Sequence, residues 1–327
     1  MDHPSMIARC LVGTLAAMLA LPVFAADYPL TVRSCDREVT FERAPQRAVS
    51  HDINLTSMLI TLGLRDRMAG YTGISGWKTL DPDFAAELGD LPELASRYPS
   101  IETLLEVDAD LFFAGWNYGM RAGGAVTPST LEPLGIPVYE LSESCSWVME
   151  QKSASLNDLY NDLQNLGRIF SVQDRAETLI DNLKQRIETV RSAVKQGSTT
   201  PRVFLYDSGE DRPTTSGQLG MPQALIEAAG GHNVMSDVSA SWTQVNWESV
   251  VERDPEVILI VDYGPRSWQQ KRDFLLQQPA LQDVQAIRER RFIVLSYLEV
   301  TPSVMNASAI EKIAAGLHPG IFGGRVP

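Results

Sequence analysis

The residue types that most often carry enzyme chemistry are sparse in this chain and form no recognisable pattern. Outside residues 1–25 the histidines are His51, His232 and His318, and none is spaced with a nucleophile in a familiar way. His51 and Asp52 are neighbours after an expected strand, where successive side chains point in different directions, so we interpret His51 as a loop or core histidine. No Gly-x-Ser-x-Gly, phosphate-loop or His-Glu-x-x-His pattern occurs. The sequence therefore predicts a protein that is not an enzyme.

Two glutamates, Glu102 and Glu248, occupy matching places in two similar segments. Residues 100–113 and 246–259 both read as a capping residue, a glutamate at the second helical position, a short helix, an acidic turn and an apolar strand. A carboxylate at a helix N-terminus is stabilised by the helix dipole, which would explain either residue alone. As a pair, they could instead dock into basic pockets of a two-fold symmetric partner. Both interpretations stay open at this point.

Aromatic residues with polar tips, and a few other polar residues, follow several expected strands. In open α/β sheets ligands bind at the carboxyl ends of strands, and rigid aromatics suit a large planar ligand. Ordinary packing would explain any one of these residues, but less well the whole group. The candidate ligand-binding residues are Tyr71, Trp116, Tyr118, Thr214, Thr215, Trp242, Tyr263, Tyr297 and Glu299. Arg121 and Arg266 could meet an anionic ligand nearby, although surface charge is their simpler interpretation.

The elements that must position these residues are short strands alternating with helices on both sides of one long helix. Such alternation predicts mostly parallel sheets covered on both faces, hence an α/β fold of two similar lobes with a cleft between them. Residues 172–196 have apolar side chains at spacings of three and four, which predicts a single helix of roughly 37 Å. Ser171 is expected to cap its start and Gly197 to close it. We expect this helix to resist bending, so that ligand binding changes the lobe angle little.

The chain divides into four expected parts: a signal peptide (1–25), an N-terminal α/β lobe (26–171), the bridging helix (172–197) and a C-terminal α/β lobe (198–327). The first part has the apolar run and the small residues before position 26 of a cleaved export signal. Removing it leaves Cys35 and Cys145, and a pair of cysteines in an exported protein favours a disulfide, with two buried thiols as the alternative. The formal charge of −13 argues against nucleic acid as a partner.

These residues resemble a known family, the periplasmic substrate-binding proteins of ABC importers for iron chelates, haem and cobalamin. The resemblance rests on residues 47–50, 62–70, 100–102 and 134–138 in the first lobe and on residues 213–217, 229–233, 242–248 and 317–319 in the second. In that family one rigid helix bridges two lobes, the ligand lies in the cleft, and a glutamate on each lobe pairs with arginines of the permease dimer. Glu102 and Glu248 fall on those positions. The match to cobalamin binders is closest at Trp116, residues 214–217 and Trp242.

The resemblance implies a monomeric periplasmic protein with no intrinsic cofactor. Its partners would be an inner-membrane ABC permease homodimer with its ATPase and a chelated iron or cobalt complex. A ferric siderophore and a corrinoid are close alternatives, and haem comes third because no axial His or Tyr is evident from sequence alone. Two other classes stay open: a metal-cluster enzyme or redox subunit that reuses the two-lobe fold, and a sensor that presents its ligand to a receptor.

Overall fold

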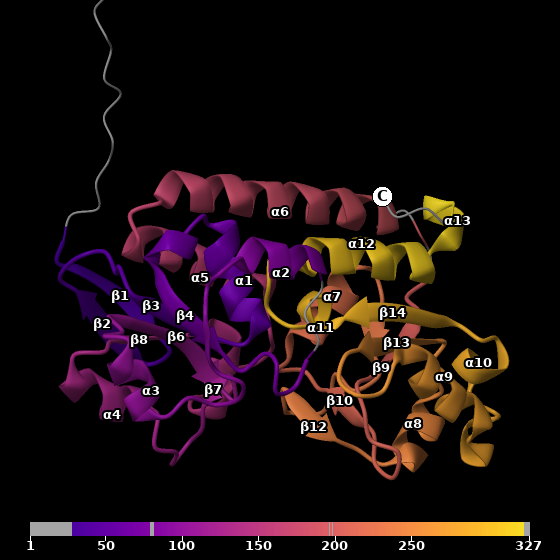
Figure 1. The fold of residues 1–327 in the computed structure, drawn as a ribbon. Coiled ribbons are helices and arrows are strands. Elements are labelled where there is room, and N and C mark those ends of the chain that lie inside the picture. Colours follow the sequence, from indigo (N-terminus) through magenta and orange to yellow (C-terminus); the bar gives the residue numbers. More distant parts are fainter. Residues whose placement is uncertain (1–27, 79–81, 196, 198, 324–327) are drawn as a thin grey trace, which may run out of the picture.

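The computed structural model describes residues 28–78, 82–195, 197 and 199–323. The expected signal peptide, residues 1–25, lies outside the described residues. Two α/β lobes lie side by side, and the long helix α6 (Gln173–Val194) runs along both of them (Figure 1). The exact boundaries of the lobes stay a prediction. Among the described residues, no helix combines the length and apolar character that a membrane span requires.

The N-terminal lobe is built on a parallel sheet in which the strand order is β5, β4, β3 and β6, with β8 and the short β7 beside β6. An antiparallel hairpin, β1 and β2, precedes the sheet. The strands are β1 (Leu30–Ser34), β2 (Arg37–Phe41), β3 (Ala48–His51), β4 (Met68–Thr72), β5 (Glu93–Ala95), β6 (Leu111–Trp116), β7 (Gly119–Met120) and β8 (Val138–Glu140). The helices are α1 (Ile53–Thr61), α2 (Pro82–Leu88), α3 (Ile101–Glu106), α4 (Pro128–Leu131) and α5 (Leu156–Ile169), with short 3-10 helices η1 (Arg65–Arg67), η2 (Glu132–Leu134) and η3 (Ser142–Trp147).

The C-terminal lobe repeats this plan with a parallel sheet of order β11, β9, β13 and β14, and an antiparallel ribbon of β10 and β12. The strands are β9 (Arg202–Tyr206), β10 (Thr214–Ser216), β11 (His232–Asn233), β12 (Trp242–Gln244), β13 (Val257–Asp262) and β14 (Phe292–Ser296). The helices are α7 (Met221–Ala228), α8 (Trp247–Arg253), α9 (Trp268–Gln277), η4 (Pro279–Leu281), α10 (Gln285–Arg288), α11 (Tyr297–Val300), α12 (Asn306–Leu317) and α13 (Pro319–Phe322).

Strand β6 shows how each sheet buries both faces. Leu111 and Phe113 pack into the apolar cluster that includes α5 and α6, whereas Phe112 and Ala114 pack into the cluster that includes α3 and α4. Successive side chains of a strand point to opposite faces, so a sheet covered on both sides needs a continuous apolar run. The same run explains why these strands could be predicted from the sequence.

Helix α6 is buried along one stripe and clamped to both lobes. The stripe consists of Ala176, Ile180, Leu183, Ile187 and Val190, at spacings of three and four residues. Its 22 residues span about 33 Å. The Arg175 guanidinium donates to the Leu62 carbonyl in the N-terminal lobe at 3.2 Å. The Arg186 guanidinium forms two hydrogen bonds, at 2.8 and 2.7 Å, with the Glu311 carboxylate on α12.

The expected capping of this helix by Ser171 is wrong. The N-cap is Val172, and no side chain caps the helix. Ser171 has a φ of 57°, whereas a capping residue needs extended backbone. Its hydroxyl lies 3.2 Å from the Tyr28 hydroxyl instead. At the other end the Gly197 amide donates to the Val194 carbonyl at 2.9 Å, in agreement with the expected close.

The disulfide favoured by the sequence is present between Cys35 and Cys145. Cys35 lies in the turn of the β1–β2 hairpin and Cys145 in η3. The bond therefore fixes the hairpin to a segment that begins just after β8. Between residues 77 and 100 the chain contains α2 and the short strand β5. Three residues are too few to show a strand period, so the sequence did not reveal β5.

Candidate functional site

A cavity of about 280 Å³ lies where the carboxyl ends of the two sheets face each other. The N-terminal lobe contributes Asn117, Tyr118 and Trp147, and the C-terminal lobe contributes Asp207, Thr214, Trp242, Tyr263 and Tyr297. Four of these residues, Asn117, Asp207, Tyr263 and Tyr297, directly follow a strand, which is where open α/β sheets bind ligands. Five of the eight are aromatic, so the walls of this interlobe cavity offer large rigid surfaces with polar tips.

Five of the nine candidate ligand-binding residues line this cavity together: Tyr118, Thr214, Trp242, Tyr263 and Tyr297. The other four are placed elsewhere. Tyr71 is buried in an apolar cluster beside Phe84, and the Trp116 indole donates to the Glu140 carboxylate at 2.9 Å. Thr215 is fully buried, since its side chain points to the opposite face from that of Thr214. Glu299 accepts from the Ser296 amide at 2.8 Å and pairs with Lys312. The polar groups of Trp116 and Glu299 are therefore already bound by neighbouring residues of the same lobe.

Three cavity residues were not among the candidates. Asp207 directly follows β9, and that position is the signal that could have indicated it. Asn117 has a φ of 65° in the turn after β6, a conformation that asparagine tolerates better than most residues. Trp147 ends η3, and no sequence pattern places it at the cleft. Its position follows from the packing of η3 and from the disulfide at Cys145.

Two tyrosine hydroxyls at the cavity are held by buried carboxylates. The Tyr263 hydroxyl donates to Asp207 at 3.0 Å, and the Tyr297 hydroxyl donates across the lobes to Asp52 at 2.9 Å. Asp52 also pairs at 2.8 Å with Lys78, and both side chains are only 7% exposed. Burial, reinforced by the partner carboxylates, raises the pKa of both phenols, so they remain neutral donors. The two rings lie 5.2 Å apart and form one rigid wall.

His51 is a core residue, as interpreted from the sequence. Its side chain is almost fully buried, and its Nδ1 lies 2.8 Å from the Thr72 hydroxyl. Burial lowers its pKa from 6.5 to about 4, so the imidazole is neutral near pH 7. Its neighbour Asp52 turns the other way, toward Lys78 and Tyr297. The described residues contain no cluster of three or more His, Cys, Asp or Glu side chains that could hold a metal ion.

A buried carboxyl joins the lobes beside the cavity. Glu143 in η3 accepts hydrogen bonds from the Ser241 hydroxyl at 2.9 Å and from the Met221 amide at 3.3 Å, both in the C-terminal lobe. Burial raises its pKa from 4.5 to about 7, and these hydrogen bonds offset the effect only in part. Among the described residues, its Oε2 atom and the Tyr118 hydroxyl have no hydrogen-bond partner. The Tyr118 hydroxyl is enclosed by protein, although the residue lines the interlobe cavity.

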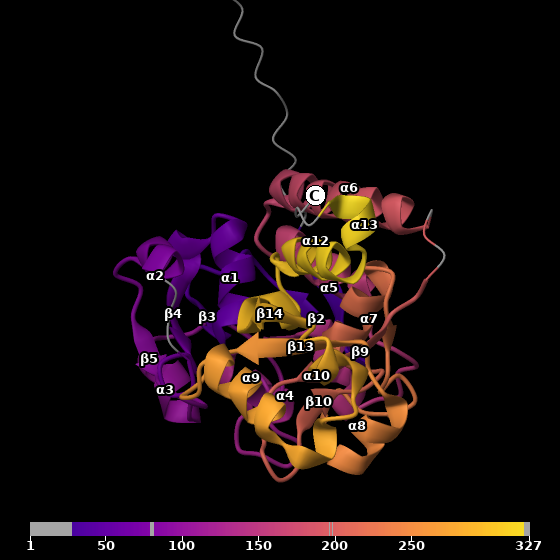
Figure 2. The ribbon, with the colours of Figure 1, turned by 90° about the vertical axis from the view of Figure 1, so that its right-hand side faces the viewer.

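Glu102 and Glu248 lie exposed on equivalent short helices, α3 and α8. Each helix starts at a side-chain cap: Ser100 accepts from the Thr103 amide and Asn246 from the Ser249 amide. Hydrogen bonds from its own backbone and from Ser100 lower the pKa of Glu102. Both helices lie on the side of the molecule away from α6, one on each lobe (Figures 1 and 2). The two helices that carry these exposed glutamates thus lie on the same side of the molecule, one on each lobe.

Comparison with known proteins places this arrangement in a family. The family model for periplasmic binding proteins matches residues 49–297, which cover most of the chain. The chain belongs to the periplasmic binding protein family, as the resemblance of its motifs predicted. It is 24% identical over 220 residues to the vitamin B12-binding protein of Yersinia pestis (strain Pestoides F), covering 67% of this chain and 70% of that protein.

Solved structures share the two-lobed fold. A periplasmic binding protein from Veillonella parvula superposes with a TM-score of 0.77 at 26% identity, covering 88% of this chain and 97% of that one. A protein of an ABC-type Fe3+-hydroxamate transport system from Saccharomonospora viridis gives 0.75 at 24% identity, covering 89% and 99%. A periplasmic heme binding protein from Pseudomonas aeruginosa gives 0.67 at 20% identity, covering 85% and 94%. The last two likenesses concern the fold alone.

Proposed function

We propose that this protein is the solute-binding component of an ABC importer and captures a metal chelate between its lobes in the periplasm. The observation that carries the proposal is the interlobe cavity, with its five aromatic side chains. The chelate would be a ferric siderophore or a corrinoid, with haem a less favoured third. The relative named for vitamin B12 binding and the fold shared with an iron-hydroxamate protein support this class of ligand.

The cleft extends beyond the interlobe cavity, as a ligand as large as a siderophore or a corrinoid requires. A second hollow of about 530 Å³ shares Tyr263 with it and continues along the C-terminal lobe past Tyr206, Arg266 and Lys271. Binding sites for small molecules commonly measure about 300–1,000 Å³. The rigid rings of Tyr263 and Tyr297 would position the chelate, and the tryptophans Trp147 and Trp242 would cover its apolar surface.

Tryptophan fluorescence tests this proposal, because Trp147 and Trp242 line the cavity. Titration of the mature protein with ferrioxamine B, ferrichrome, ferric citrate, cyanocobalamin and hemin should produce saturable quenching by at least one of them. Trp147→Phe with Trp242→Phe should remove most of the signal, whereas Trp268→Phe on α9, which does not line the cavity, should leave it. If no chelate binds more tightly than about 10 μM, roughly −7 kcal/mol, the assignment fails.

We also propose that Glu102 and Glu248 dock the protein on the permease homodimer. Three observations support this docking role. Both glutamates are exposed, both occupy the second position of a short helix, and the two helices lie on the same side of the molecule. Carboxylates at the rim of an interface mainly steer association and fix its orientation, so their loss should act on docking and leave the cavity unchanged.

Two double variants separate docking from a general charge effect. Glu102→Ala with Glu248→Ala should weaken binding to the reconstituted permease and ATPase about tenfold or more at low salt. Glu106→Ala with Glu252→Ala removes the same charge from the same two helices, one turn further on, and should change binding little. Ligand affinity should be equal in all forms. A loss of ligand binding with intact docking would reverse the assignment.

The two other classes are less well supported. A metal-cluster subunit needs free thiolates, whereas Cys35 and Cys145 are bonded to each other. A ligand-presenting sensor would use the same cleft, and transport in reconstituted vesicles separates it from an importer component. An importer component should stimulate ATP-dependent uptake, which a sensor would not.

A further inference from the structure

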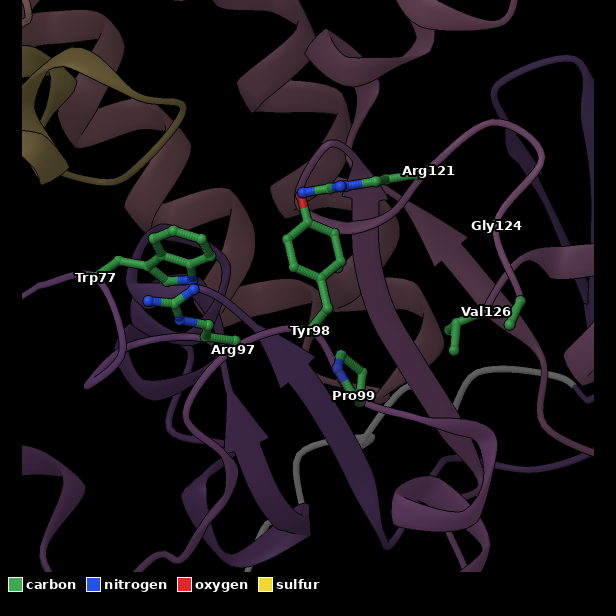
Figure 3. Close-up of a pocket in the computed structure, with 9 residues that line it drawn as sticks. Trp77, Arg97, Tyr98, Pro99, Arg121, Gly124 and Val126 are labelled. Carbon is green, nitrogen blue, oxygen red and sulfur yellow. The ribbon is translucent and has the colours of Figure 1, made fainter.

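The N-terminal lobe contains a cavity of its own, next to the interlobe cavity. It measures about 380 Å³ and lies among the loops that follow β4, β5 and β7 (Figure 3). Its walls include Trp77, Arg97, Tyr98, Pro99, Arg121 and Val126. We refer to it as the arginine cavity.

One turn, residues 117–119, lies between the interlobe cavity and the arginine cavity. Asn117 and Tyr118 line the interlobe cavity, and Gly119 lines the arginine cavity. The Tyr98 hydroxyl donates to the Asn117 carbonyl at 2.8 Å, which fixes this turn from the arginine side. Gly119 has a φ of +96°, and a Cβ atom there would lie 2.7 Å from the Cβ of His51. The course of the turn therefore depends on glycine and on the buried histidine behind it.

The charge of the arginine cavity is opposite to that of the whole protein. The chain carries a formal charge of −13, yet the described residues that line this cavity include two arginines and no carboxylate. Within the described part of the chain neither Arg97 nor Arg121 forms an ion pair. By contrast, Arg266 on the facing lobe is paired with Glu210. The positive charge on the N-terminal wall therefore has no ion-pair partner among the described residues.

The guanidinium groups of both arginines lie over aromatic rings. The Arg97 guanidinium lies 4.2 Å from the Trp77 ring centre, and the Arg121 guanidinium lies 4.6 Å from the Tyr98 ring centre (Figure 3). A guanidinium attracted to the π face of a ring makes no hydrogen bond there, so its N–H groups stay available for another acceptor. The edge of a guanidinium matches the two oxygens of a carboxylate or phosphate.

We infer that the arginine cavity is a subsite of the cleft for an acidic group, a carboxylate or phosphate at the periphery of the bound chelate. The inference rests on the proposed function and narrows it, since it selects chelates with anionic arms over neutral or cationic ones. The chelate core would lie against the aromatic walls of the interlobe cavity, and its acidic arm would pass the turn at residues 117–119 to reach Arg97 and Arg121.

Paired chelates and a double variant test the subsite. Ferric citrate carries carboxylates, ferrioxamine B carries a cationic amine, and metal-free citrate reports on the subsite alone. Calorimetry of the mature protein should show citrate binding, and Arg97→Gln with Arg121→Gln should weaken both citrate and ferric citrate about tenfold or more. Ferrioxamine B affinity should not fall. The control, Arg43→Gln with Arg191→Gln, removes the same charge from exposed sites outside the cleft and should change citrate affinity less than about twofold.

The outcomes separate this subsite from the proposed function. If metal chelates bind but the double variant binds the acidic ones as tightly as the natural chain, the subsite is refuted and the function stands. If citrate binding depends on both arginines while no chelate binds, the subsite stands and the metal-chelate function fails. If citrate does not bind the natural chain, the subsite is refuted. Should the glutamine variant fail to fold, Arg97→Lys with Arg121→Lys decides, because it keeps the charge but loses the two-pronged edge and should still weaken citrate binding.

Discussion

Replacement of Glu143 by glutamine should make the protein more stable at alkaline pH and leave it nearly unchanged at acidic pH. The glutamine oxygen can accept the same two hydrogen bonds, from the Ser241 hydroxyl and the Met221 amide. Its amide group takes the place of Oε2, the atom that has no partner among the described residues. The substitution therefore keeps the shape and the contacts of the interlobe carboxyl and removes only its ability to ionise.

The expected size follows from the pKa of Glu143, which burial raises from 4.5 to about 7. An acid whose pKa is higher in the folded state binds its proton more tightly there. Its contribution to stability is therefore complete below pH 4.5 and is lost as the pH rises through 7. At about 1.4 kcal/mol per pKa unit, the ionised carboxylate lowers the free energy of unfolding by about 3 kcal/mol at alkaline pH. Glu143→Gln should recover most of that amount.

Urea denaturation near pH 5 and near pH 8.5 measures this difference. The natural chain should lose stability between the two values, partly because burial also raises the pKa of Asp162 to about 7. The difference between the natural chain and Glu143→Gln isolates Glu143. The matched control is Glu140→Gln, which breaks a buried ion pair with Arg37 and should lower the free energy of unfolding at both pH values. An equal pH dependence in the natural chain and Glu143→Gln would refute the reasoning.

Three further predictions concern the structure around the cavities. Replacing Cys35 and Cys145 by serine opens a loop of 110 residues and should lower the free energy of unfolding by about 2–5 kcal/mol in urea denaturation without reductant; equal stability of the variant and the oxidised natural chain would contradict this. Gly119→Ala forces a positive φ and a contact with His51, so it should lower the melting temperature, with a loss of about 2 kcal/mol or more. Tyr118→Phe removes a buried hydroxyl that has no geometrically formed hydrogen bond among the described residues, so it should leave the unfolding free energy in urea denaturation equal or higher; a loss of stability would oppose this.

The features that the sequence predicted well are those set by local pattern. The apolar stripe of α6, the continuous apolar runs of the strands and the matching segments around Glu102 and Glu248 each depend on residues a few positions apart. The two-lobed α/β fold follows from these elements and was predicted correctly. The cysteine pair needed only the expectation of an oxidising compartment.

The features that escaped depend on contacts between distant segments. Ser171 has the residue type of a cap, but its φ is 57° and its hydroxyl lies 3.2 Å from that of Tyr28, a residue far away in the sequence. Glu299 follows a strand as a cleft residue should, but its carboxylate turns back to cap its own helix, α11. Glu143 and Trp147 lie in a segment without a clear period. Their places at the lobe interface and at the cavity exist only once α7 of the other lobe packs against η3.

The clamping of α6 bears on how an importer could tell a loaded protein from an empty one. Because Arg175 binds this helix to one lobe and Arg186 binds it to the other, we expect the helix to keep the angle between the lobes nearly constant. The separation of Glu102 and Glu248 would then be nearly the same with or without cargo. Empty protein would occupy the permease as readily as loaded protein and compete with it. The signal that cargo has arrived would have to come from the rim of the cleft, where side chains such as Trp147 can respond to it.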